Sequence, residues 1–294
     1  MDAADLKVFE AVARLGGMNR AAGALNTVQS NVTQRIRRLE EELDTALFER
    51  HARGVALTAA GQRLLPYATR VAQLLDEARR AVADDGAPKG PLNLGSLETT
   101  AALRLAPVLA SFAAAYPEVD LALTTGTSAE LVELVLARRL EGAFVCGPVR
   151  HPELAEEVVF REELVLVTQR SRLDAEALLA ARDLKIVVLR AGCSYRQRLE
   201  EILARRGIVG LRRLEFGSID GLIGCAAAGI GVTLLPRGVV ASAAREGRVS
   251  LHTLPSEAAD VETLFIRRRD GYVSSALAAF LAEARGTPAR AAAE

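Results

Sequence analysis

Apolar side chains recur at helical spacing through the first 43 residues of the chain. The pattern predicts three helices, over residues 4–15, 20–25 and 28–43. Asn26 and Thr27 are expected to form the turn before the third helix, because Asn tolerates unusual backbone angles and Thr can cap a following helix. The buried stripe of the third helix is expected to comprise Val32, Ile36, Leu39 and Leu43. This arrangement indicates a helix–turn–helix.

Two short extended pieces and one long helix follow. Residues 46–50 and 55–58 flank a basic turn, 51–54, and predict a wing with Arg53 at its tip. Thr58 is expected to cap a helix that runs to about residue 84, with a kink at Pro66. Its apolar residues stand at roughly heptad spacing and comprise Leu64, Val71, Leu74, Leu75, Ala78 and Val82. Such a helix cannot bury its stripe alone, so we expect a dimer seam.

After a Gly- and Pro-containing hinge, predicted strands and helices alternate to the end of the chain. Strands are expected over residues 92–95, 120–125, 142–145, 164–168, 185–189, 232–235 and 261–267. Helices are expected over residues 100–115, 128–140, 195–206, 219–228 and 274–284. The alternation predicts α/β lobes with mostly parallel sheets. In such sheets, ligands bind beyond the carboxyl ends of the strands.

The charge of the chain is balanced overall but uneven along its length. The 294 residues contain 37 Lys and Arg and 37 Asp and Glu. Between Arg14 and Arg38 there are five arginines and no acid, within the predicted helix–turn–helix. A protein that binds nucleic acid needs a locally unopposed positive face, not a basic chain as a whole. We therefore expect such a face on this motif.

The polar face of the third helix has the chemistry of a major-groove reader. Asn and Gln can pair with adenine edges, Arg with guanine, and Ser or Thr with phosphates or bases. A plain solvated face is the alternative for any one amphipathic helix. The first turns of the helix are the expected readers, the later arginines the expected backbone anchors. The candidates for DNA binding are Gln29, Ser30, Asn31, Thr33, Gln34, Arg35, Arg38, Arg50 and Arg53.

The N-terminal segment resembles the LysR-type transcriptional regulators. The similarity extends without interruption over about forty residues: Ala21-Ala22, Leu25, residues 29–34, Ile36, Leu39-Glu40, Leu43, Leu47-Phe48, Arg50, Leu57-Thr58 and Gly61. The family often has Arg where Gln34 stands, so base readout is expected to differ here. Two later pieces, residues 192–196 and 227–236, look like the effector domain of these regulators.

The resemblance implies the fold class, an α/β chain with an N-terminal winged helix–turn–helix and a long linker helix. A two-lobed α/β effector domain resembling type 2 periplasmic binding proteins would follow. The expected divisions are a DNA-binding domain (1–58), a linker helix (59–84), a hinge (85–91) and an effector domain (92–286). Lobe I would take about 92–161 and 266–286, lobe II about 162–265, and residues 287–294 would form a disordered tail.

Three polar loops follow strands of the second part, at residues 95–100, 126–128 and 192–196. Hydroxyls and free backbone N–H groups at helix N-termini suit a small anion, although each Ser or Thr alone could be an ordinary helix cap. No lysine or arginine stands unambiguously in the cleft, so the charge of the effector stays open. By family position, the effector-binding candidates are Ser96, Thr99, Thr100, Thr127, Ser128, Cys146, Ser194 and Tyr195.

Two other function classes are less well supported by the residues. An enzyme would need a nucleophile with a base, and Cys193-Ser194 has no partner histidine in the sequence. A solute receptor would need an export signal, which the amphipathic, charged N-terminus does not provide. A redox role for Cys146 is opposed by the absence of a neighbouring base that would lower its pKa.

The expected partners follow from this interpretation. They are double-stranded DNA with two-fold related half-sites, a small-molecule effector, and further copies of the chain in a homodimer or homotetramer. No cofactor, metal site or membrane span is expected. Three widely spaced cysteines without a disulfide or metal pattern favour the reducing cytoplasm.

Overall fold

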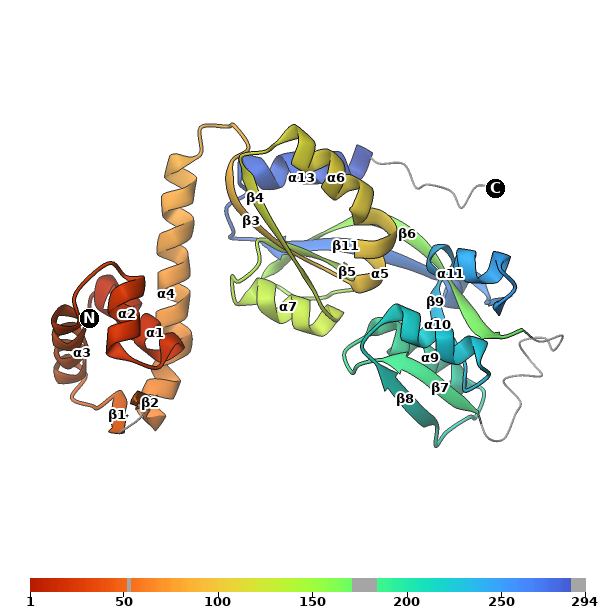
Figure 1. The fold of residues 1–294 in the computed structure, drawn as a ribbon, viewed down its shortest axis with the longest axis horizontal. Helices are drawn as coiled ribbons and strands as arrows, with labels where there is room; N and C mark the ends of the chain where they lie inside the picture. Colours follow the sequence, from red (N-terminus) through yellow and green to blue (C-terminus); the bar gives the residue numbers. More distant parts are fainter. Residues whose placement is uncertain (52–53, 171–183, 287–294) are drawn as a thin grey trace. The chain divides into compact units, whose positions relative to one another are not determined.

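The computed structural model describes residues 1–51, 54–170 and 184–286, which form two compact units divided at residues 85 and 86 (Figure 1). The division falls at the start of the predicted hinge. The finer domain limits stay predictions, and the predicted disordered tail, 287–294, lies outside the described residues.

The first unit contains the predicted helix–turn–helix and wing. Its elements are α1 (Ala3–Leu15), α2 (Met18–Ala24), α3 (Gln29–Glu42), β1 (Phe48–His51), β2 (Gly54–Leu57) and α4 (Ala59–Ala83). Asn26 has a positive φ of 49°, as its place in the turn predicts. Two details of the prediction are wrong. Leu43 follows α3 and is 37% exposed, and Val28 rather than Thr27 is the N-cap of α3.

The core of the first unit forms where α1 and α3 meet the wing. Phe9, Ile36 and Leu39 are almost fully buried there, and the rings of Phe9 and Phe48 lie 5.2 Å apart. The Glu40 carboxylate of α3 accepts hydrogen bonds from the backbone N–H groups of Leu47 (2.7 Å) and Phe48 (3.1 Å). This contact fixes the first strand of the wing to the end of α3.

Some apolar residues of the long helix α4 pack against the core of the first unit, and others are exposed. Thr58 caps it through a bond from the Gly61 N–H (3.0 Å), as predicted, and the helix continues through Pro66. Leu64 and Val71 pack against the core of their own unit instead of forming a seam. The large apolar residues left exposed on α4 are Tyr67 (71%), Leu74 (41%) and Val82 (90%).

The second unit alternates strands and helices, and its labels follow Figure 1. The strands are β3 (Gly90–Ser96), β4 (Val119–Thr125), β5 (Gly142–Cys146), β6 (Leu154–Gln169), β7 (Lys185–Leu189), β8 (Arg212–Phe216), β9 (Thr233–Pro236), β10 (Val249–Thr253) and β11 (Asp260–Arg268). The helices are α5 (Glu98–Thr100), the π-helical η1 (Ala101–Leu105), α6 (Ala106–Ala115), α7 (Ser128–Leu136), α9 (Ser194–Arg205), α10 (Ile219–Ala227), α11 (Arg237–Arg245), α12 (Ser256–Ala259) and α13 (Ser275–Gly286).

The strands of this unit form mixed sheets, which corrects the prediction of mostly parallel ones. β3 is parallel to β4 and β5, and β7 is parallel to β8. β11 runs antiparallel to β5 and β6, and β6 runs antiparallel to β9 and β10. The long strand β6 takes part in most of the antiparallel pairs, because it pairs with β11 at its start and with β9 and β10 at its end. Antiparallel neighbours need no helical crossover, so the alternation of elements does not reveal them.

Strand β6 joins the two lobes of the unit. Its residues 154–163 pair with β11, and its residues 164–169 pair with β9 and β10. We call the part built on β3, β4, β5 and β11 the first lobe, and the part built on β7 to β10 the second lobe. The pairing of β11 begins at Asp260, within one residue of the returning strand that the sequence predicted over residues 261–267.

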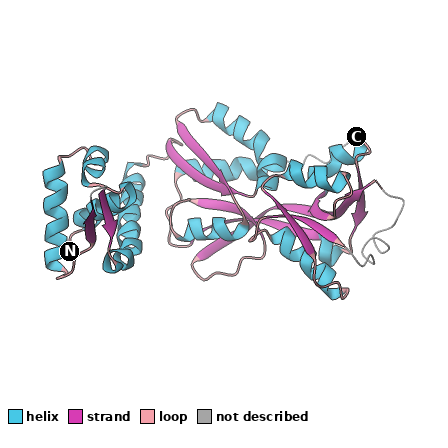
Figure 2. Cartoon of the chain, turned by 60° about the horizontal axis from the view of Figure 1, so that its bottom comes forward, coloured by secondary structure: helices cyan, strands magenta, loops and turns pink. Residues whose placement is uncertain are grey.

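Helices cover both faces of the first lobe's strands (Figures 1 and 2). Alternate residues of β5 serve the two faces: Phe144 packs with α6 and α13, whereas Ala143 and Val145 pack with α7. The α7 side continues as one apolar cluster into the second lobe, where it includes Ile186 and Leu199. The lobes therefore share a buried apolar contact.

We predict that Gly61→Ala destabilises the first unit, because its Cβ would lie 2.3 Å from the Leu47 carbonyl oxygen. Overpacking of this kind costs about 1–3 kcal/mol. Gly23, also in a helix, has nothing within 4 Å of the added carbon. Gly23→Ala should therefore stabilise the unit by about 0.5–1 kcal/mol. Thermal unfolding of both full-length variants measures this, and equal Tm values would contradict it.

Candidate functional site

The outer face of α3 presents a short row of polar side chains. Gln29, Ser30 and Gln34 are exposed, whereas Asn31 and Thr33 are half-buried. Asn31 is turned back along the helix, since its Nδ2 donates to the Thr27 hydroxyl at 2.9 Å. The expected readers therefore lie on one face of α3, with Asn31 the most constrained of them.

The positive face of this motif is opposed by a buried acid. Asp5 of α1 is 1% exposed, and its Oδ1 accepts a hydrogen bond from the Arg35 guanidinium at 2.8 Å. Its Oδ2 lies 4.0 Å from Arg38 Nε and has no hydrogen-bond partner in the part of the chain that the structure describes. The prediction of an unopposed positive face is therefore wrong for Arg35 and Arg38, whereas Arg20 and Arg37 have no carboxylate partner among the described residues. Asp5 lies outside the acid-free segment in sequence but beneath it in space.

Two exposed residues on or beside α3 were missing from the predicted set. Arg37 stands seven residues after Ser30, on the same face, and has no ion-pair partner among the described residues. Val28 is 65% exposed at the start of α3, and an apolar side chain can contact the methyl group of thymine. Helical spacing would have found Arg37. Arg53 lies outside the described residues, and only the backbone of Arg50, in β1, is described.

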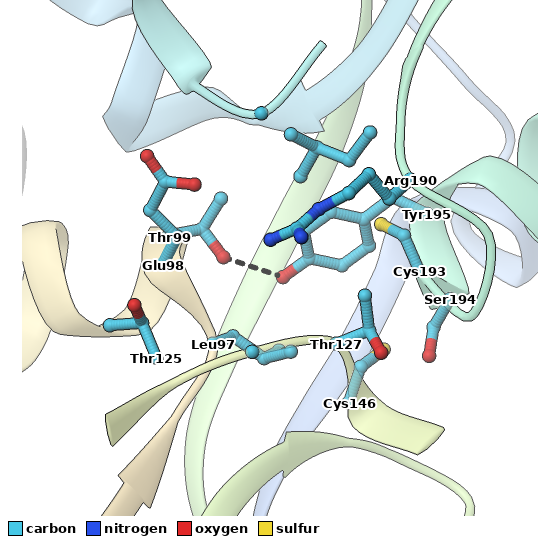
Figure 3. Close-up of a pocket in the computed structure, with 13 residues that line it drawn as sticks. Leu97, Glu98, Thr99, Thr125, Thr127, Cys146, Arg190, Cys193, Ser194 and Tyr195 are labelled. Atoms are coloured by element: carbon cyan, nitrogen blue, oxygen red, sulfur yellow. Dashed lines mark hydrogen bonds between the residues drawn. The ribbon is translucent and has the colours of Figure 1, made fainter. Parts of the chain in front are cut away.

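A pocket lies where the two lobes of the second unit meet (Figure 3). Its cavity volume is about 230 Å³. Five of the predicted effector-binding residues line it: Thr99, Thr127, Cys146, Ser194 and Tyr195. The loops after β3 and β4 and the last residue of β5 supply the first lobe's wall. The end of β7, the loop after it, the start of α9 and Gly217 supply the second lobe's wall. The carboxyl ends of neighbouring strands thus form the pocket, as the sequence predicted.

Three of the predicted residues do not line the pocket. The Ser96 hydroxyl is fully buried and donates to the Leu97 carbonyl oxygen at 2.9 Å, and Thr100 is buried away from the lining. The Ser128 hydroxyl accepts from the Cys146 N–H (3.3 Å) and from the Ser194 hydroxyl (3.1 Å). Ser128 and Ser194 therefore connect the lobes.

A second polar contact between the lobes lies inside the pocket. The Thr99 hydroxyl and the Tyr195 phenol are 3.5 Å apart, and both side chains are buried (Figure 3). At Gly192, whose φ is 91°, an added Cβ would lie 2.9 Å from the Thr127 hydroxyl. The lobes thus approach closely on this side, and only glycine fits the approach.

The helix ends at the pocket differ from one another, although the sequence suggested three similar anion sites. Thr127 and Glu130 form a capping box at the start of α7. The pKa of Glu130 is lowered, first by the Thr127 backbone N–H and its hydroxyl and then by the charge of Arg190. The start of α7 therefore already holds a carboxylate. The start of α9, capped by Cys193, has no side-chain cap bond.

Two charged residues line the pocket that the sequence did not single out, Glu98 and Arg190. Glu98 is half-buried on the first lobe, and Arg190 is exposed on the second. Arg190 follows β7 directly, so its place beyond a strand's carboxyl end was a signal available in the sequence. The sequence left open whether a basic side chain lines the cleft, and Arg190 does so.

The thiols and the phenol in the pocket are held in their neutral forms. Burial raises the pKa of Cys146 from 9.0 to about 11, and burial also raises the pKa of Cys193. The pKa of Tyr195 is raised mainly by burial as well. Because thiolates are the reactive form, both cysteines are expected to be poor nucleophiles.

The described residues contain no cluster of three or more His, Cys, Asp or Glu side chains suited to a metal ion. Within those residues, no helix has the length and hydropathy needed to cross a membrane.

Family models match both units of the chain. Residues 3–62 match a model described as a bacterial regulatory helix-turn-helix protein of the lysR family, and residues 85–288 match the LysR substrate binding domain. Among curated relatives, the HTH-type transcriptional regulator GltR of Bacillus subtilis is 44% identical over 280 residues. That alignment covers 95% of each chain.

Solved structures show the same fold. Full-length CbnR, in a crystal with its target DNA, is 26% identical and covers 97% of this chain and 99% of its own, with a TM-score of 0.52. A full-length OxyR variant from Pseudomonas aeruginosa is 17% identical, covers 98% and 96%, and has a TM-score of 0.72.

We predict that Cys146 reacts slowly with alkylating agents at neutral pH. A pKa of about 11 instead of 9.0 lowers the thiolate fraction about a hundredfold, and the reaction rate should rise with pH up to about 11. Iodoacetamide labelling of the Cys193→Ser, Cys225→Ser protein, followed by mass spectrometry, gives the rate. Fast labelling at pH 7 would contradict the buried, protonated thiol.

Proposed function

Since the chain belongs to the LysR family of transcriptional regulators, we propose which of its residues bind DNA and which bind the effector. Regulators of this family bind DNA through the N-terminal helix–turn–helix and a small molecule through the C-terminal domain. They are transcriptional regulators, not enzymes.

We propose that the start of α3 reads the major groove. Ser30 and Gln34 are exposed, and neither side chain has a hydrogen-bond partner among the described residues that would hold it away from a base edge. The amide of Gln34 can pair with adenine in bidentate fashion. Arg37 and Arg38 lie further along the helix and would contact phosphates, with Arg35 restrained by Asp5. Gln29, Thr33 and Arg50 complete the proposed interface, and Val28 would contact a thymine methyl group.

The exposed stripe of α4 supports a dimer. Tyr67, Leu74 and Val82 recur at spacings of seven and eight residues and leave large apolar surfaces in water. Pairing two copies of α4 along this stripe would bury them. A two-fold dimer would then bind two related half-sites on the DNA.

We propose that the effector occupies the pocket between the lobes. Thr99 and Tyr195 from opposite lobes meet there with a long contact of 3.5 Å, which a ligand could replace with shorter bonds. A ligand that touches both lobes favours the arrangement in which it makes the most contacts. Arg190 supports an anionic group on the ligand. DNA as the target and the unpaired cysteines of the described chain support action in the cytoplasm.

Gln34→Ala tests the reading of DNA by α3. We expect it to lower affinity for the operator by about 1–3 kcal/mol while non-specific affinity stays the same, because only a base contact is lost. Fluorescence anisotropy measures the specific affinity with a duplex from the region upstream of this protein's own gene. The same method measures the non-specific affinity with a scrambled duplex. Gln62→Ala, an exposed glutamine on α4, is the matched control. Equal losses on the two duplexes would exclude base readout by Gln34.

Asp5→Asn tests the restraint on the positive face. Without the carboxylate, Arg35 is free to reach a phosphate, so we expect tighter non-specific binding. One added phosphate contact makes the slope of log K against log salt more negative by about 0.9. Asp2→Asn removes the same charge from α1 at a site that only caps the helix, and its slope should not change. An unchanged slope in Asp5→Asn would show that Asp5 does not restrain Arg35.

A further inference from the structure

Two opposite charges line the pocket without pairing with each other. Glu98 stands on the first lobe and Arg190 on the second, and the lining contains both. Neither side chain makes an ion pair or hydrogen bond with any residue in the described ranges. In Figure 3, Arg190 extends from the second lobe over Tyr195 toward Thr99 and Glu98.

Other charged groups near the pocket have partners already. Glu130 is engaged in the α7 capping box, and Arg190 influences its pKa without contacting it. Arg196, just beyond the lining, pairs with Glu200 and Glu215. Glu98 and Arg190 are therefore the charges that remain available to a ligand in this pocket.

The rest of the lining limits the ligand to a small molecule. A cavity of about 230 Å³ is below the usual size of a pocket for a drug-sized ligand. The hydroxyls of Thr99, Thr127 and Tyr195 offer hydrogen bonds between the two charges. Because the pKa of Tyr195 is raised, its phenol stays neutral and can donate.

We propose that the effector is a small amphoteric molecule of the α-amino acid class. Its carboxylate binds Arg190 and its ammonium group binds Glu98, so one ligand satisfies a charge on each lobe. Charged hydrogen bonds of this kind are the strong ones in a partly buried site. The bridge would favour the arrangement in which the lobes are held together. This inference rests on the proposed effector pocket.

The first experiment compares matched ligands on the full-length protein by thermal shift. Each of the common L-amino acids is tested beside its deaminated acid and its decarboxylated amine. We expect at least one amino acid to raise Tm in a concentration-dependent way, because a ligand that binds only the folded state stabilises it. The matched acid and amine should give smaller shifts. No shift with any amino acid overturns the proposal.

The second experiment measures Kd by calorimetry for the amino acid found and for its deaminated acid. Glu98→Gln should weaken the amino acid at least about tenfold and leave the acid unchanged, whereas Arg190→Gln should weaken both. Glu133→Gln and Arg212→Gln, exposed charges on the same two lobes, are the controls and should change neither. Equal binding of amino acid and acid to the wild type overturns the amphoteric class but leaves the pocket as effector site.

Two further outcomes separate this inference from the function it rests on. If Thr99→Val and Thr127→Val leave ligand binding unchanged, the pocket itself is not the effector site. If Glu98→Gln lowers the Tm of the ligand-free protein by several degrees while Glu133→Gln does not, Glu98 and Arg190 pair with each other. That pairing would also overturn the proposal.

Discussion

The second unit depends on one strand that belongs to both lobes. The ladder of β6 pairs with β11 up to Glu163 and with β9 and β10 from Leu164 onward. A continuous backbone ladder cannot slide without shifting its whole register, so the lobes are held at a fixed junction. The apolar cluster that contains Leu131 and Leu199 covers the same junction. The pocket exists because the loops beyond the strand ends meet above this junction.

The two units handle charge in opposite ways. On the helix–turn–helix, Asp5 is almost fully buried and is tolerated because Arg35 satisfies one of its oxygens. In the pocket, Glu98 and Arg190 have no such partner but keep contact with water, so leaving them unpaired costs less. In the proposed function, the buried Asp5 restrains Arg35 on the surface that binds DNA. Unpaired, hydrated charges suit a site that binds its ligand reversibly.

Elements with strong apolar patterns could be predicted from the sequence, and those without could not. The fully buried β5 and the periodic α3 were placed within one or two residues. The strand β8 (Arg212–Phe216) was missed because four of its five residues are exposed, and its charged and apolar residues do not alternate. It is a strand because it pairs in parallel with β7, a tertiary cause that no local pattern records. The mixed direction of the sheets was missed for the same reason.

The pairing of charged residues could not be predicted from their order in the sequence, because it depends on the three-dimensional packing. The five arginines of the motif suggested a free positive face, but Asp5 lies 30 residues before Arg35 and contacts it across two helices. Conversely, Arg190 was overlooked because it stands alone in sequence, although strand-end logic located its neighbours Thr99 and Thr127. Local charge runs therefore identify which segment meets nucleic acid. Which individual charges are available to a partner is decided by the packing of helices and lobes, since a buried acid neutralises what the linear count leaves unopposed.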